Sequence, residues 1–494
     1  MNRGAPAPAE ETIMEQKVIV PVAALPARAP TLPVGFVPTP SAAYRMHRKI
    51  VGLAQQPGRP RPKATTPPSG ARVLMWKQDP SVTEMGTRKA FLPGVLLEGP
   101  RDARIASGQP GIAPVAPNAF GDFIVPPDTD QFDAVHTFAV VRQTLTMFQR
   151  VLAAHDGGPV PWAWNSGSNT DPLQVYPHGL PNVMNAYYSR NERALKFGDF
   201  VQTNEAAAAR IYTCRSFDIV AHETGHAVLD GLKPRWILSS APPQTGGLHE
   251  AFGDLTAIFL ALAQMDQVEA IIAQTRADLH DKTFLADMAE QFGLALGRPN
   301  GLRNADNDLT LSQTGTEVHA ISQVFTGAVY DILADIFAFE RRPGLEDDAA
   351  VLHRVGAYLC GLTLRALIAA PERNATYADV ANAMLKLAQA DGRPADYAGF
   401  IRNRFTLREV VLGAQDAPAE LAAAFVDAPG AVQDRRACCG TMNHPEYRDH
   451  ADLLEQERQA LARWCHGYLA RGALEPASSE ELAAADYGVG REAP

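Results

Sequence analysis

The spacing of apolar residues separates a proline-interrupted part of the chain from a helical part. More than half of the 38 prolines lie before residue 130, in stretches such as PARAPTLPVGFVPTP and GRPRPKATTPP that favour extended backbone. Between these stretches, the short apolar runs ARVLMW and FLPGVLLEG predict strands. We therefore expect residues 1–130 to form a proline-rich arm with some β structure.

A helical pattern begins near Phe132. The segment FDAVHTFAVVRQTLTMFQRVLAAH places apolar residues at helical spacing and stops before a pair of glycines. Helices are predicted to dominate from Ser216 onward, and one of them opens with Thr376 and Asp379 in a capping-box pattern. Residues 416–494 are acidic and alanine-rich, which predicts a helical C-terminal tail.

Composition indicates a globular protein and narrows its partners. Hydrophobic residues make up 46% and charged residues 20% of the 494 positions, enough apolar material for more than one core. The net charge of −10 argues against nucleic acid as a partner, because phosphate binding needs clustered Lys and Arg. No uninterrupted apolar run reaches the roughly 18 residues that cross a bilayer, so we expect no membrane partner.

The N-terminus and the cysteines bear on the cellular compartment. Glu10, Glu11 and Glu15 stand where a secretion signal would need a basic region followed by an apolar stretch. The five cysteines are odd in number and scattered, so they predict no disulfide framework. We therefore expect a cytoplasmic protein, with a missing precursor segment or non-classical export as the alternatives.

One short helix carries two histidines at the spacing of a metal site. Ser216 can cap this helix, which contains the sequence IVAHETGHAVLDGL. His222 and His226 are four residues apart and share a face, where one cation can meet both imidazoles. Glu223 points beside the cation and can take a proton from metal-activated water. The pentapeptide could also arise by chance in a structural helix, although Gly225 would then cost about 1 kcal/mol relative to alanine.

A second predicted helix supplies a carboxylate that can complete the site. In GGLHEAFGDLTAIF, Glu250 and Asp254 lie four residues apart. Glu250 would give a site of two histidines and one carboxylate, with a fourth position open to water. Asp254 would accept a hydrogen bond from the outer nitrogen of His222 or His226 and fix its tautomer. The alternative, two surface carboxylates, is disfavoured by the apolar residues around them: Leu248, Phe252, Leu255, Ile258 and Phe259.

Together these two motifs resemble the thermolysin-like zinc metalloendopeptidases, gluzincins in which a downstream glutamate completes the HExxH site. Further segments agree: NVMNAYY is similar to the family's edge strand, GLRNADND to its arginine loop, and VHAISQVFTGAVY to the segment with its catalytic histidine. The similarity covers roughly residues 130–415. It implies an α+β fold of two lobes, a mixed β-containing lobe at 131–235 and a helical lobe at 236–415, with zinc in the cleft between them.

The resemblance also implies a role for each matching residue in hydrolysis of a peptide or protein substrate. Glu223 would be the general base, and His319 would donate to the developing oxyanion. Asn185 and Ala186 would bind the peptide backbone, and Arg303 a carbonyl on the leaving-group side. Without the resemblance these outer residues would be predicted to cap, stabilise a turn or form surface ion pairs. The implied Zn²⁺ ligands are His222, His226 and Glu250.

Several positions depart from the family's pattern. Thr314 stands where an aspartate orients the catalytic histidine, and Glu317 could replace it. We find no match for the family's second oxyanion donor, a tyrosine, since nearby Trp236 offers only an indole N–H. Asp218 matches a Ca²⁺ ligand, but Ala261 stands where another calcium carboxylate is expected, which argues against calcium dependence. No inhibitory propeptide is evident, unless the proline-rich arm covers the cleft.

Two other functions remain open. A zinc-stabilised, non-catalytic binding protein on the same scaffold would fit these departures, but Glu223 and His319 are not needed merely to hold zinc. An aminopeptidase would use the same metal triad, yet the chain has no Gly-Ala-Met-Glu-Asn segment to hold a free amine. No motif identifies side-chain specificity or the oligomeric state. We do not predict a second metal site from the C-terminal cysteines and histidines, because their spacing fits no common zinc module. These residues are Cys438, Cys439, His444, Cys465 and His466.

Overall fold

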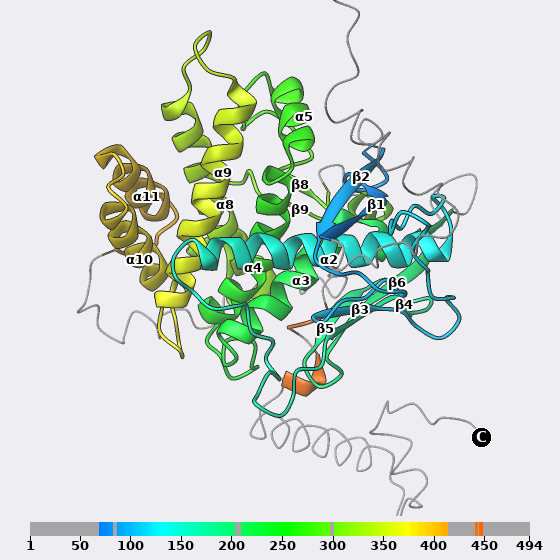
Figure 1. Ribbon diagram of the computed structural model, residues 1–494. Coiled ribbons are helices and arrows are strands. Elements are labelled where there is room, and N and C mark those ends of the chain that lie inside the picture. The colour runs from blue at the N-terminus through cyan, green and yellow to red at the C-terminus, as the bar shows by residue number, and fades with distance from the viewer. Residues whose placement is uncertain are drawn as a thin grey trace, which may run out of the picture. The chain divides into compact units, whose positions relative to one another are not determined.

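The protein is represented by a computed structural model (Figure 1). The chain divides into two units, Met1–Pro67 and Pro68–Pro494, and the residues that can be described all belong to the second. The first half of the predicted proline-rich arm and nearly all of the predicted C-terminal tail therefore lie outside the described residues. The described ranges are 69–82, 86–202, 209–296, 301–412, 440–442 and 444–447.

A mixed five-stranded sheet lies in the N-terminal part of this unit. Its strands are β3 (Ile105–Ser107), β4 (Leu173–Leu180), β5 (Ala186–Ser189), β6 (Ala194–Gln202) and β7 (Ala209–Tyr212). The strand order is β3-β4-β6-β5, with β7 also paired to β6. The β3–β4 and β4–β6 pairs are parallel, whereas β5 and β7 run antiparallel to β6. Among the described strands β5 pairs with β6 alone, so it forms an edge of the sheet.

Two smaller sheets flank this one in the sequence. An antiparallel pair joins β1 (Gly70–Trp76) to β2 (Thr87–Pro93), and another joins β8 (Asp287–Met288) to β9 (Arg303–Asn304). The strand predicted from ARVLMW is confirmed by β1. The one predicted from FLPGVLLEG is wrong in its bounds, because β2 begins earlier and ends at Pro93. Gly94 follows with φ of 98°, a left-handed conformation that turns the chain out of the strand.

Helix α2 (Asp130–Ala153) packs across the sheet and contacts β1, β3 and β4 (Figure 1). Thr129 caps its first turn by accepting a hydrogen bond from the Phe132 N–H. Most of its apolar residues are buried, and the helix predicted from Phe132 to the glycine pair is confirmed.

Helices dominate the remainder of the described unit. α3 (Phe217–Leu232) packs against α4 (Pro243–Leu262), which packs against α8 (Val318–Glu340). α10 (Tyr377–Ala390) packs against both α9 (Asp348–Ala369) and α11 (Ala395–Leu407). The predicted capping box of Thr376 and Asp379 is confirmed at the start of α10. The observed class is therefore α+β, a mixed sheet followed by a largely helical region. Three shorter helices lie between α4 and α8 in the sequence: α5 (Met265–Thr275), α6 (Glu290–Ala295) and α7 (Leu311–Thr314).

Two described helices, α8 and α9, are long and apolar enough to cross a membrane by length and composition, and α4 with α5 would qualify if the bent pair were one span. Within the protein, 83% of the apolar window of α8 and 67% of that of α9 are buried. Core packing thus accounts for most of their apolar surface, and the expected absence of a membrane partner stays a prediction.

Glycines allow α3 and α4 to cross at close range. A Cβ atom on Gly225 of α3 would lie 2.7 Å from Thr256 Oγ1 and 3.1 Å from the Cα of Gly253. A Cβ on Gly253 of α4 would lie 2.6 Å from the ring of His222. Neither helix could therefore carry a side chain at the crossing without moving apart from the other.

We expect Gly225→Ala to lower the free energy of unfolding by about 1–3 kcal/mol, because crowding against Thr256 outweighs a propensity gain of about 1 kcal/mol. Chemical denaturation followed by circular dichroism measures the change. Gly399→Ala is the matched control, since a Cβ on this glycine of α11 would meet open space and should stabilise the helix. Stabilisation by both substitutions would contradict the close crossing.

Candidate metal centre

Three buried side chains meet where α3 crosses α4. His222 and His226 come from α3 and Glu250 from α4, and their ligand atoms all lie within 4.8 Å of one another. His222 Nε2 is 3.5 Å from Glu250 Oε2, and His226 Nε2 is 3.6 Å from Glu250 Oε1. A tetrahedral ion with bonds of about 2.0–2.1 Å holds its ligand atoms about 3.3 Å apart. The three residues are therefore spaced to hold one metal ion.

The local sequence places both histidines where the centre needs them. Ser216 caps α3 by accepting a hydrogen bond from the Ile219 N–H, as predicted, and the helix begins at Phe217, about two and a half turns before His226. His222 Nε2 is buried and has no hydrogen-bond partner among the described residues, while its Nδ1 is held at 2.9 Å by Asp254 Oδ1. An imidazole protonated at Nδ1 presents a lone pair at Nε2, which is the form that binds a metal. Two imidazoles and a carboxylate suit Zn²⁺ and other divalent transition metals.

Asp254 lies at the outer nitrogen of His222, where the sequence predicted a contact with one of the two histidines. Its Oδ1 also accepts a hydrogen bond from Arg303 Nη2 at 2.6 Å. Burial alone would raise the pKa of Asp254, but the Arg303 guanidinium and His222 together lower it below its usual value. Asp254 is therefore a carboxylate in the folded protein. Arg303, predicted to bind a substrate carbonyl, is brought to the centre through this ion pair.

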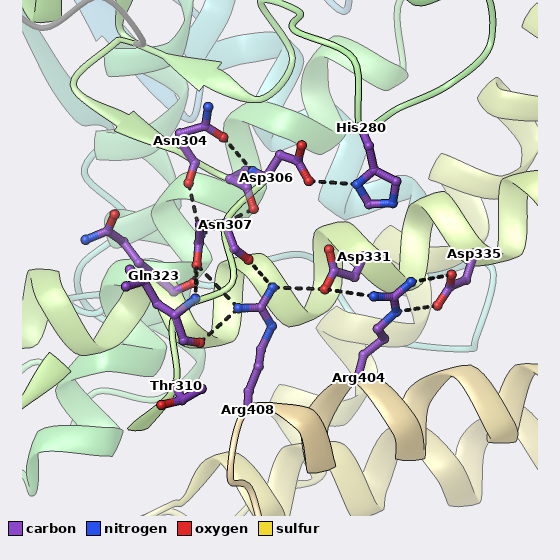
Figure 2. A network of polar contacts seen from close by, with 12 residues as sticks. His280, Asn304, Asp306, Asn307, Thr310, Gln323, Asp331, Asp335, Arg404 and Arg408 are labelled. Atoms are coloured by element: carbon purple, nitrogen blue, oxygen red, sulfur yellow. Dashed lines mark hydrogen bonds and ion pairs between the residues drawn. The ribbon is translucent and has the colours of Figure 1, made fainter. Parts of the chain in front are cut away.

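A network of polar contacts anchors the loop that follows Arg303 (Figure 2). Arg408 Nη1 donates to the Leu309 carbonyl at 2.9 Å, and its Nη2 donates to Asp331 Oδ2 at 2.9 Å. Arg408 also donates to the carbonyl of Asn307. The network therefore holds the loop that follows β9, the short strand that carries Arg303 and pairs with β8. No local sequence pattern predicts these contacts, because Arg408 and Leu309 are 99 positions apart.

His226 is held by a residue that sequence reasoning missed. Its Nδ1 lies 2.8 Å from His249 Nδ1, and the two rings stack with centroids 4.9 Å apart. Burial lowers the pKa of His249 to about 3, so its ring is neutral. A His226 ring that binds metal through Nε2 carries its proton on Nδ1 and donates it to His249 Nδ1. The only sequence feature that pointed to this contact was the position of His249 directly before the predicted ligand Glu250.

Glu223 is buried beside the two histidines of α3. Its Oε2 accepts a hydrogen bond of 2.7 Å from the hydroxyl of Thr441, 218 positions away in the sequence. Thr441 was not singled out by sequence reasoning, because no local pattern links the two segments. The predicted role of Glu223 as general base stays a prediction.

His319, at the N-terminus of α8, also lies against Glu250. Its Nε2 is 3.4 Å from Glu250 Oε1, and its Nδ1 is 2.6 Å from Glu317 Oε1. Glu317, suggested as the replacement for the family's aspartate, thus contacts the ring, whereas the Thr314 hydroxyl donates to the carbonyl of Leu311. The replacement itself stays a prediction. Burial opposes protonation of His319, but Glu250 and Glu317 raise its pKa above the usual value.

The residues predicted to bind a peptide backbone, Asn185 and Ala186, lie at the edge of the sheet and do not belong to the His-His-Glu group. Asn185 directly precedes β5 and accepts a hydrogen bond from the Ala186 N–H on Oδ1 at 2.9 Å. The Ala186 carbonyl accepts a hydrogen bond from the Gly440 N–H at 2.8 Å. The Trp236 indole donates to the carbonyl of Pro371 at 3.1 Å, so this N–H is committed within the fold. The substrate-binding roles of Asn185 and Ala186 stay predictions.

The residue that matched a Ca²⁺ ligand lies among other carboxylates. Burial and the nearby Asp79 raise the pKa of Asp218 to about 7. Burial, with Asp79, Asp218 and Asp287 close by, raises the pKa of Glu290 to about 8. Ala261 is buried in α4 and offers no ligand. The expectation against calcium dependence stays a prediction.

Two other groups of ligand-type side chains occur in the described part of the chain, and arginines already pair with both. Arg408 donates to Asp331 at 2.9 Å, and Arg215 donates to Asp133 at 2.8 and 3.0 Å. A guanidinium supplies the positive charge that a metal would bring, so we interpret both as ion-pair networks. The groups are His280, Asp306 and Asp331, and Asp133, His178 and Cys214.

Most of the C-terminal group of cysteines and histidines lies outside the described residues. Of its members only His444 is described, and its ring packs on Tyr187 with centroids 4.7 Å apart. The others lie outside the described residues: Cys438, Cys439, Cys465 and His466.

No protein-family model matches the chain, and no curated protein matches it. The features that bear on function are therefore the sequence motifs and the buried His-His-Glu group, a group of residues that could hold a metal ion.

We expect Asp254→Asn to weaken metal binding by about 10- to 100-fold, because the substitution removes the carboxylate that holds His222 in its metal-binding tautomer. Titration of the metal-free protein with Zn²⁺ against a competing chelator measures the affinity. Asp335→Asn is the matched control, because Asp335 is also an arginine-paired aspartate but its partner is Arg404. An unchanged affinity in Asp254→Asn would contradict the assigned role.

We expect the free energy of unfolding to fall as the pH rises from about 5 to 9, in part because of Glu290. Its folded-state pKa, about 8, lies above the ordinary 4.5, so the folded protein holds this proton more tightly than the unfolded chain does. The resulting stabilisation is complete below pH 4.5 and disappears as the pH passes 8. Urea denaturation at a series of pH values should show a shallower decline for Glu290→Gln. Parallel curves would show that Glu290 does not titrate in this range.

Proposed function

We propose that the protein is a zinc-dependent endopeptidase of the thermolysin-like type. The observation that carries the proposal is the compact buried group of His222, His226 and Glu250, in which each histidine has an orienting partner. The sequence resemblance supports the same reading, since both ligand motifs and the segments around them match that family. A structural metal would need the three ligands but not the glutamate beside them.

The residues of the chain would divide the work of hydrolysis. A bound Zn²⁺ would supply Lewis acidity and lower the pKa of a water molecule to about 7. Glu223, which is buried next to the ligands, would take the proton from the attacking water and pass it to the leaving amine. Glu250 would balance part of the metal charge, and Asp254 would keep His222 in its binding tautomer.

His319 would stabilise the oxygen that gains charge during attack. Glu317 holds its Nδ1–H, which directs the opposite nitrogen toward the centre, and the raised pKa favours the form in which that nitrogen also donates. A preorganised donor of this kind is typically worth roughly 3–4 kcal/mol of transition-state stabilisation.

Strand β5 would hold the substrate in extended form. As an edge strand it can accept a peptide by strand addition, with main-chain hydrogen bonds supplying the affinity. Asn185 directly precedes β5 and Ala186 begins it, while Arg303 reaches the centre through its hydrogen bond to Asp254.

A zinc-stabilised binding protein is the second candidate, and one observation favours it. The Thr441 hydroxyl donates a hydrogen bond to the Glu223 carboxylate, so this carboxylate already has a partner within the protein. On this alternative the group of His222, His226 and Glu250 would stabilise the crossing of α3 and α4 without turnover.

Glu223→Gln should leave zinc bound and reduce turnover by about 10²- to 10⁴-fold, because it removes the proton acceptor and keeps the metal ligands. The measurement is cleavage of a mixed peptide library by zinc-loaded protein, read by mass spectrometry, with metal content determined on the same samples. Glu346→Gln, an exposed glutamate paired with Arg354, is the control for the loss of one carboxylate.

Internal cuts that disappear in Glu223→Gln would support an endopeptidase. Removal of single residues from the amino end would instead indicate an aminopeptidase. Full activity in Glu223→Gln would exclude the assigned base.

A further inference from the structure

A short piece of the C-terminal region lies along the free edge of β5. We name residues 440–442 and 444–447 the clip segment. The Gly440 N–H donates to the Ala186 carbonyl at 2.8 Å, and the Tyr188 N–H donates to Thr441 Oγ1 at 2.8 Å. Ala186 and Tyr188 are alternate residues of β5, the spacing at which a strand offers its main-chain groups to one neighbour. The clip segment thus takes up the hydrogen-bonding positions that an added strand would use.

The other end of the clip segment is anchored by a carboxylate and a tyrosine. Glu446 accepts hydrogen bonds from Ser189 Oγ at 2.8 Å and from the Arg190 N–H at 2.7 Å. The Tyr447 carbonyl accepts one from the Ser239 N–H at 2.9 Å, and the side chain of Tyr447 is buried. The segment is therefore built into the fold at both ends of β5.

Thr441 joins this edge to the candidate metal centre. Its side chain is fully buried, and the same hydroxyl that accepts from Tyr188 donates to Glu223 Oε2 at 2.7 Å. Gly440 lies against Asn185, since a Cβ on this glycine would be 2.6 Å from Asn185 Nδ2. The clip segment therefore touches the two positions expected to bind a peptide backbone and the glutamate expected to act as base.

We propose that the clip segment is a built-in inhibitor that occupies the peptide-binding edge and engages the general base. The inference rests on the proposed endopeptidase function and adds its regulation. The Thr441 hydroxyl donates to Glu223 Oε2 at 2.7 Å, so while the clip segment is in place a water molecule cannot donate along that lone pair. A peptide must displace Gly440 and Thr441 to reach the edge, so turnover scales with the fraction of protein in which the clip segment is released.

The clip segment is a different part of the chain from the proline-rich arm, residues 1–130. The alternative left open by the sequence was that the proline-rich arm covers the cleft, and residues 1–68 of that arm lie outside the described residues. The clip segment comes from the opposite end of the chain, within a region predicted only as a helical tail.

The first test compares Thr441→Val with Thr441→Ser in the full-length, zinc-loaded protein. Valine keeps the shape of threonine but can neither donate to Glu223 nor accept from Tyr188, whereas serine retains the hydroxyl. Loss of a buried hydrogen bond to a charged group shifts an equilibrium by about 10- to 100-fold. We expect turnover of the mixed peptide library to rise by that factor in Thr441→Val and to stay near the wild-type rate in Thr441→Ser. Adding Glu223→Gln to Thr441→Val should abolish the gain.

A second readout does not depend on turnover. A short peptide hydroxamate, which chelates zinc and lies along the substrate edge, should bind Thr441→Val more tightly than wild type by a similar factor. Gly440→Pro, which removes the N–H donated to Ala186, provides an independent release of the clip segment and should act in the same direction. Circular dichroism and zinc content establish that each variant is folded and loaded.

The outcomes separate the inference from the function on which it rests. Equal turnover and equal hydroxamate affinity in wild type, Thr441→Val and Gly440→Pro would overturn the inhibitor while leaving an active endopeptidase. Tighter hydroxamate binding by both variants, with no peptide cleavage in any of them, would retain the clip segment as a cover and reject the endopeptidase.

Discussion

The close crossing of α3 and α4 is the constraint on which the candidate centre depends. Gly225 and Gly253 leave out the side-chain atoms that would separate the two helices. At this separation the imidazoles of one helix and the carboxylate of the other come within the ligand spacing of a single ion. The glycine in the middle of α3 lowers its intrinsic helix propensity, and the packing across the crossing compensates for that loss.

The crossing also brings ionisable groups out of water, and the fold supplies each with a partner. Burial disfavours the charge on Glu250, yet His319 and the two α3 histidines hold its pKa well below the ordinary value. Asp254 is stabilised by Arg303. The strand that carries Arg303 pairs with β8, and the loop that follows it is held by the network around Arg408 (Figure 2). The local charge balance is therefore set by elements from across the helical region.

The sequence was informative where the relevant spacing is local. His222 and His226 could be paired because four residues make about one helical turn, and the same periodicity located Asp254 relative to Glu250. His249 was missed because adjacent helical residues ordinarily face different directions, and its contact depends on how α4 lies against α3. Contacts made by the clip segment could not be predicted, because no periodic pattern relates residues more than two hundred positions apart. The strand predicted from FLPGVLLEG ran past Pro93 and Gly94, although a proline has no N–H for a sheet and Gly94 turns the chain with a positive φ.

Because the clip segment and the edge it covers belong to one polypeptide, their association is unimolecular. Dilution that dissociates a separate inhibitor would leave this contact in place, and its strength would be set by an effective concentration rather than by the amount of protein present. A substrate would compete according to the length of edge that it can cover. Extended, unfolded chains that pair along all of β5 would then be favoured over short peptides that replace only Thr441.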